Sequence, residues 1–113
     1  MKLNLKYKND TMAQPLPFMF HLGIGQIYAA NTNNPDSIIG FVHNYFRVSL
    51  PCKLTVTAGA YHQVILQMDI ARWFDGQNAF NFADYPNGIM QNQEGMSNAC
   101  LNGRKAFSII TPK

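Results

Sequence analysis

An imidazole at the end of an apolar run is the feature of this sequence best suited to chemistry. His21 follows the apolar residues 18–20 and is itself followed by Gly23 and Gly25. A neutral imidazole is the commonest side-chain metal ligand, and the glycines allow a sharp bend with open space beside the ring. Two interpretations of His21 are open: a metal ligand, or a structural histidine at a strand end whose ring nitrogens bond to neighbours.

Two further histidines extend the candidate set. His43 lies within a predicted strand on a face shared with Tyr45 and Arg47, where a metal-binding and a structural role fit equally well. His62 begins another predicted strand and suits a structural imidazole bonded to a loop carbonyl. Imidazoles with soft neighbours suit copper or zinc. We therefore take His21 as the principal candidate metal ligand and His43 as the second.

The sequence offers few side-chain groups that are suited to catalysis. The six acidic residues are scattered, without the close pair that glycosidase-type acid–base chemistry needs. Nucleophile-elbow, phosphate-loop and His-Glu-x-x-His motifs are absent from the sequence. Cys52 and Cys100 have no zinc-site spacing, so they are either one disulfide or two small buried thiols. The sequence therefore predicts a protein that is not an enzyme, with no catalytic residues.

Composition narrows the class further. With 113 residues the chain suits one domain, and its hydrophobic fraction of 47% is ample for a core. The charged fraction is only 13%, while 12 Asn and 7 Gln supply much of the polarity. The net charge of +3 comes from scattered residues, which excludes the clustered cations of a nucleic-acid interface. No apolar run approaches the ~20 residues of a transmembrane helix.

Hydrophobic alternation with a period of two predicts mostly strands. The segment 38–50 is the longest candidate, and Pro51 ends it. The other predicted strands, separated by Gly, Pro and Asn turns, are residues 2–8, 16–22, 53–57, 60–69 and 106–111. This pattern indicates an all-β fold, an antiparallel β-sandwich of immunoglobulin-like or jelly-roll-like type formed as a single domain by residues 1–113.

Helical structure is expected only in the C-terminal half. Residues 69–74 suit a helical turn with Asp69 as N-cap and Trp73 packing inward. Residues 91–101 suit one short helix near the C-terminus. We expect Asn102 and Gly103 to end that helix in a left-handed cap.

Three blocks in fixed order carry a family resemblance: residues 18–28 (FMFHLGIGQIY), residues 68–74 (MDIARWF), and residues 89–96 with 102–107 (IMQNQEGM and NGRKAF). Together they resemble the C-terminal part of the MbnP-like copper-binding proteins, over residues from about 16 to 111. The resemblance implies a β-sandwich that handles copper in the periplasm or outside the cell, beside a di-haem cytochrome peroxidase partner.

The departures from that family qualify these expectations. Family members begin with further strands that carry a tryptophan and another histidine, so we expect this chain to be a truncated version of the longer domain. The tryptophan oxidised to kynurenine in copper-binding members has no counterpart, because Trp73 lies in a different block. The start of the chain also has no apolar signal-peptide segment. The alternative function is a structural or interaction β-domain whose histidines bind no metal.

Overall fold

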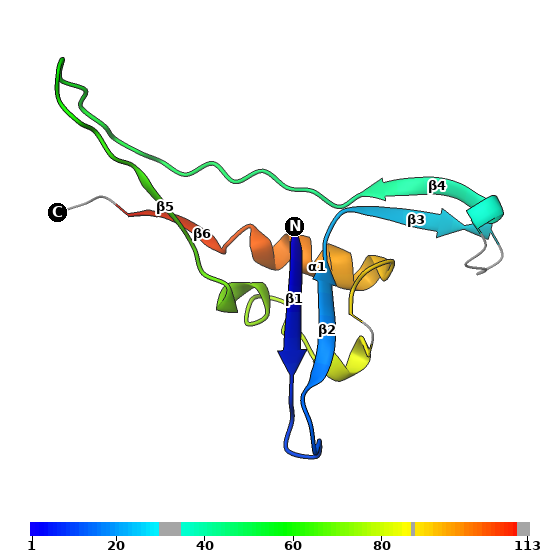
Figure 1. The fold of residues 1–113 in the computed structure, drawn as a ribbon. Coiled ribbons are helices and arrows are strands. Elements are labelled where there is room, and N and C mark those ends of the chain that lie inside the picture. The colour runs from blue at the N-terminus through cyan, green and yellow to red at the C-terminus, as the bar shows by residue number, and fades with distance from the viewer. Residues whose placement is uncertain (30–34, 87, 111–113) are drawn as a thin grey trace.

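Short antiparallel strands dominate the structure (Figure 1). The computed structural model describes residues 1–29, 35–86 and 88–110. Within these ranges the strands form three separate two-stranded sheets, accompanied by one α-helix near the C-terminus. The elements are β1 (Lys2–Tyr7), β2 (Leu16–His21), β3 (Ile24–Tyr28), β4 (Ile38–His43), β5 (Ile65–Met68), α1 (Gln93–Gly103) and β6 (Phe107–Ile110). The predicted antiparallel, β-rich class with one short helix is confirmed.

The β1–β2 hairpin follows directly from the alternation in its sequence. Its register pairs Lys2 with His21 and Leu5 with Phe18. Phe18 and Phe20 are buried on one face, while Met19 is exposed on the other. The two predicted strands are therefore present, and the apolar face of the hairpin supplies one wall of the core.

The bend expected at the glycines is present at Gly23, whereas Gly25 lies within a strand of the β3–β4 ribbon. After a turn at Gly23 the chain continues as strand β3, whose Ile24 pairs with His43 of β4. Strand β4 then ends at His43, seven residues short of the predicted end of the strand at residue 50. The alternation continues beyond His43, but no neighbouring strand among the described residues supplies a hydrogen-bonded ladder there.

The β5–β6 ribbon is also shorter than predicted. Its register runs from Ile65 opposite Ile110 to Met68 opposite Phe107. Residues 53–57 and 60–64, expected in strands, are extended but unpaired in the structure. The turn between them is present at residues 58–59, where Gly59 has a φ of 75°.

Helix α1 begins where its sequence provides a cap. The side chain of Asn92 accepts a hydrogen bond from the backbone N–H of Gly95 at 2.8 Å. The expected left-handed cap at residues 102–103 is wrong, since the helix continues through Gly103 and its C-cap, Arg104, is right-handed with a φ of −59°. A side chain at Gly103 would collide with the ring of Trp73, so this glycine serves close packing. Among the described helices, none is long and apolar enough to cross a membrane.

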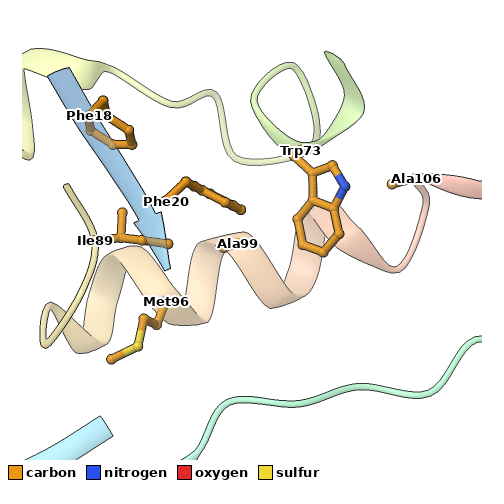
Figure 2. Packing of buried hydrophobic residues seen from close by; sticks show 7 residues of the cluster. All are labelled: Phe18, Phe20, Trp73, Ile89, Met96, Ala99 and Ala106. Carbon is orange, nitrogen blue, oxygen red and sulfur yellow. The ribbon is translucent and has the colours of Figure 1, made fainter. Parts of the chain in front are cut away.

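The core gathers where β2, α1 and the short 3₁₀ turn Ala71–Trp73 (η3) meet (Figure 2). Phe20 packs against Trp73 and Phe74, with ring centroids 5.7 and 5.0 Å apart. Such edge-on aromatic pairs add about 0.5–1.5 kcal/mol beyond the area they bury. Trp73 is buried as predicted. The N-cap of the turn is Ile70 and not Asp69 as expected, although the Asp69 side chain accepts a hydrogen bond from the N–H of Ala71. The buried apolar residues are Phe18, Phe20, Trp73, Ile89, Met96, Ala99 and Ala106.

One buried amide ties these elements together. Asn102 of α1 is 1% exposed. Its Nδ2 donates to the carbonyls of Trp73 and Asn78 at 3.1 and 2.7 Å, and its Oδ1 accepts from the Asn78 N–H at 3.1 Å. The amide therefore fixes the helix, the 3₁₀ turn and the following loop relative to one another.

We expect Asn102→Ala to lower the free energy of unfolding by about 2–4 kcal/mol, because the carbonyls of Trp73 and Asn78 lose their donor and the Asn78 N–H loses its acceptor. Asn98→Ala, on the same helix, is the control and should change stability by no more than about 0.5 kcal/mol. Urea denaturation followed by the fluorescence of Trp73 measures both. Equal losses in the two variants would contradict the role given to Asn102.

Candidate metal site

His21 lies on the face of β2 that is turned away from the core. Phe18 and Phe20 point into the core, whereas His21 is half-buried opposite Lys2 of β1. Its Nε2 lies 3.0 Å from Oδ1 of Asn4. When Nε2 carries the proton, it donates to this oxygen, and the lone pair of Nδ1 is free to bind a metal.

This hydrogen bond matches the usual support of a metal-binding histidine. Such a histidine normally donates its second ring N–H to a neighbouring oxygen, which fixes the tautomer and the orientation of the ring. Asn4 supplies that oxygen from the adjacent strand. The Asn4–His21 pair therefore suits metal ligation through Nδ1.

A hollow of about 540 Å³ adjoins His21. Soft donors are concentrated in its walls, since three of the six methionines of the chain line it together with the imidazole. Thioether and imidazole groups together suit a soft ion such as Cu(I). The lining residues are Met1, Lys2, His21, Leu22, Gly23, Ile24, Met90, Gln91 and Met96.

A reciprocal amide pair holds one of these methionines in place. Asn44 Nδ2 donates to Gln93 Oε1 at 3.1 Å, and Gln93 Nε2 donates back to Asn44 Oδ1 at 2.8 Å. Nδ2 of Asn44 also lies 3.5 Å from the sulfur of Met96. The thioether is thus positioned by a link between the end of β4 and the first turn of α1.

A second amide, that of Gln91, links the wall of the hollow to β3. Gln91 has a φ of 63°, which is uncommon for a residue other than glycine. Its Oε1 accepts a hydrogen bond from the backbone N–H of Gln26 at 3.1 Å. This contact joins the segment before α1 to strand β3.

His43 occupies a different position from His21. Its neighbour Asn44 points inward to α1, so the alternation of an extended chain turns His43 outward, and it is exposed. In the register of the ribbon it lies opposite Ile24, which lines the hollow. The structure therefore places His21 in the wall of the hollow and His43 beside one of its wall residues.

His62 takes part in a turn of the extended segment. Its Nε2 lies 3.0 Å from the backbone nitrogen of Thr57 and 3.2 Å from its carbonyl oxygen. This contact closes the turn at residues 58–59 and agrees with the structural role favoured for this histidine.

The cysteines are separate thiols in the structure. Cys52 is exposed on the extended segment, and Cys100 is half-buried on α1. Burial raises the pKa of the Cys100 thiol, and the nearby charges of Arg104 and the amino terminus partly oppose this. Within the described ranges, no group of three His, Cys, Asp or Glu side chains is arranged to hold a metal ion.

The thioethers at the hollow were not predicted as ligands, because the methionines of the sequence are unclustered and suit core filling. Met96 does fill the core, being 2% exposed, while Met90 is largely exposed. Only folding brings these two residues, which flank the start of α1, to the same hollow as His21. Their spacing in the sequence carries no metal-binding motif.

Comparison with known proteins finds no relative of this chain. The chain matches no protein-family model, no curated protein and no solved structure. Any functional assignment therefore depends on the residues and their arrangement.

The two glycines after His21 should tolerate substitution differently. A Cβ at Gly25 would collide with Oε1 of Gln93 and crowd Met96, whereas a Cβ at Gly23 meets open space. We expect Gly25→Ala to lower the free energy of unfolding by about 1–3 kcal/mol by displacing the Asn44–Gln93 pair. Gly23→Ala is the matched control and should stay within about 0.5 kcal/mol. Urea denaturation of both variants tests this, and a neutral Gly25→Ala would contradict it.

Proposed function

We propose that this chain is a non-catalytic copper-handling protein of the MbnP-like type that binds Cu(I) at the hollow beside His21. The observation that carries the proposal is that one histidine, His21, and two methionines, Met90 and Met96, line a single hollow. These donor types favour Cu(I) over harder ions. The ribbons would belong to a β-sandwich, as in the family that the sequence resembles.

The proposed ligand set starts from His21, through Nδ1, with Met90 and Met96 as thioether donors. Asn4 would keep the proton on Nε2, and Asn44 would orient the sulfur of Met96. Bound copper would supply a one-electron redox centre. The protein's own residues would capture the ion through their soft donor atoms.

Location and partner follow from the same resemblance. A periplasmic or extracellular site, with a di-haem cytochrome peroxidase as partner, belongs to the proposal on the strength of the sequence blocks around His21 and Trp73. The low charge of the chain, with only 13% charged residues, is in keeping with export.

Copper binding is tested by anaerobic titration of Cu(I) in competition with a chromophoric chelator. We expect saturable binding that His21→Ala weakens at least about tenfold, a size typical of losing a ligand or its support. Met90→Leu keeps the volume and removes the sulfur, so it should also weaken binding. His62→Ala is the control and should bind as the wild type does. Unchanged affinity in His21→Ala would refute the site.

The same titration with His43→Ala tests the second imidazole predicted from the sequence. If His43 reaches the ion, its loss weakens binding as that of His21 does. Because its strand turns it outward, we expect a smaller effect than for His21. An effect as large as that of His21→Ala would contradict this order of importance.

Acid should weaken the binding of Cu(I) or Cu(II). Protons compete with the metal for the imidazole lone pair, so affinity falls as the pH is lowered into the acidic range. Thioethers take up no proton in this range, so the His21→Ala variant should keep only a weak and nearly pH-independent affinity. Titrations at several pH values check this, and a flat wild-type profile would contradict ligation by imidazole.

A second candidate function is an interaction β-domain without metal. The observation that favours it is the set of exposed apolar side chains on residues 54–66, among them Val56 at 73% and Leu66 at 63% exposure. If the wild type shows no saturable copper binding, this second function becomes the better-supported one.

A further inference from the structure

Residues 44–64 form a long extended arm that leaves the body of the molecule and returns to it at β5 (Figure 1). From residue 46 to residue 56, no backbone N–H or carbonyl is hydrogen-bonded to another part of the described chain. Unpaired extended backbone of this kind is a template for pairing with another chain.

One side of this arm is apolar. Exposure alternates strictly from residue 45 to residue 50, with the even-numbered side chains more buried than the odd-numbered ones. Arg47 and Lys53, its two charged residues, are odd-numbered and so fall on the opposite face. Phe46, Val48 and Leu50 form the apolar face. Continued alternation of the extended chain places Cys52, Leu54 and Val56, which are exposed, on the same face.

The base of the arm opens onto an apolar groove of about 410 Å³. Trp73 lies in its lining and is buried, and its indole Nε1 has no hydrogen-bond partner among the described residues. Val48 and Leu50 of the arm, with Leu66 of β5, continue the lining. Phe46, Val48 and Leu50 therefore belong both to the groove and to the apolar face of the arm.

The solvent-accessible surface of this chain is much larger than that of a typical compact monomer of the same mass. Its accessible surface is 8465 Å², against about 6,200 Å² expected for a folded monomer of this mass. Its radius of gyration is 18.6 Å, against about 13 Å for a typical domain. The excess surface is about 2,200 Å². If each of two copies buried half of this excess against the other, the interface would bury about 2,200 Å² in total, which is within the range of obligate homodimers.

We propose that this chain forms a twofold dimer in which the arms (residues 44–64) and the Trp73 grooves of two copies cover one another. Each copy offers both the apolar arm and the groove, which is what a self-complementary twofold interface requires. Arg47 and Lys53 lie on the face turned away from this contact, so the two positively charged arms need not bring like charges together.

The test is the molar mass of the metal-free protein, which makes it independent of the copper proposal. Light scattering from about 100 µM to about 1 µM should show a species of twice 12.7 kDa, about 25 kDa, that dissociates on dilution. Val56→Lys places a charge on the apolar face and should weaken the dimer at least about tenfold. Thr55→Lys, on the opposite face, is the matched control and should leave it unchanged.

Val56 is 73% exposed, so the lysine variant should fold normally, and circular dichroism checks that it does. Cys52 gives a second measurement in a Cys100→Ser background, because it lies on the apolar face of the arm. Its thiol should be protected from alkylation in the dimer and react freely in Val56→Lys.

Three outcomes overturn the proposal. The first is a wild type that stays monomeric at about 100 µM, which would assign the groove to a different partner. The second is a dimer that Val56→Lys and Thr55→Lys affect equally. The third is a dimer in which Cys52 reacts as fast as in the monomer.

Discussion

The body of the molecule depends on the buried amide of Asn102. Three hydrogen bonds join it to the backbone of Trp73 and Asn78. The helix, the 3₁₀ turn and the next loop are therefore held in fixed positions relative to one another. Once Trp73 is fixed in this way, Phe20 of β2 packs against it on one side and Phe107 of β6 on another. Two of the ribbons thus meet at the indole, and the groove at the base of the arm takes its floor from the same ring.

Much of the secondary structure could be predicted from local pattern, and the exceptions have a common cause. Alternation shows that one face of a segment is suited to burial, but it does not show that a partner strand exists. The segment 38–50 satisfies the pattern throughout, yet only residues 38–43 have β3 beside them. Conversely, β3 escaped prediction because Gly25, which suggests a bend, sits in a strand where Gln93 and Met96 leave no room for a side chain.

The candidate site shows the same limit of local sequence pattern, which does not tell which residues meet in space. His21 stands out in the sequence because two glycines closely follow the imidazole, and in the structure it lines a hollow. Met90 and Met96 could not be chosen, since methionine is common in cores and only the packing of α1 against β3 brings them to the hollow. The outward direction of His43 likewise depends on Asn44, whose inward hydrogen bond to Gln93 spans 49 residues of sequence.

The pairing of β5 with β6 has a consequence for the order of folding. Their ladder closes a loop of residues 69–106, whereas the β1–β2 hairpin closes over residues 8–15 alone. The chain entropy lost on closing a loop grows with its length, and contacts distant in sequence slow folding. We therefore expect the hairpin to form before the ladder between β5 and β6. During that interval the edge of β5 has no partner strand and remains open to solvent, which makes this a stage at which the chain is prone to aggregate.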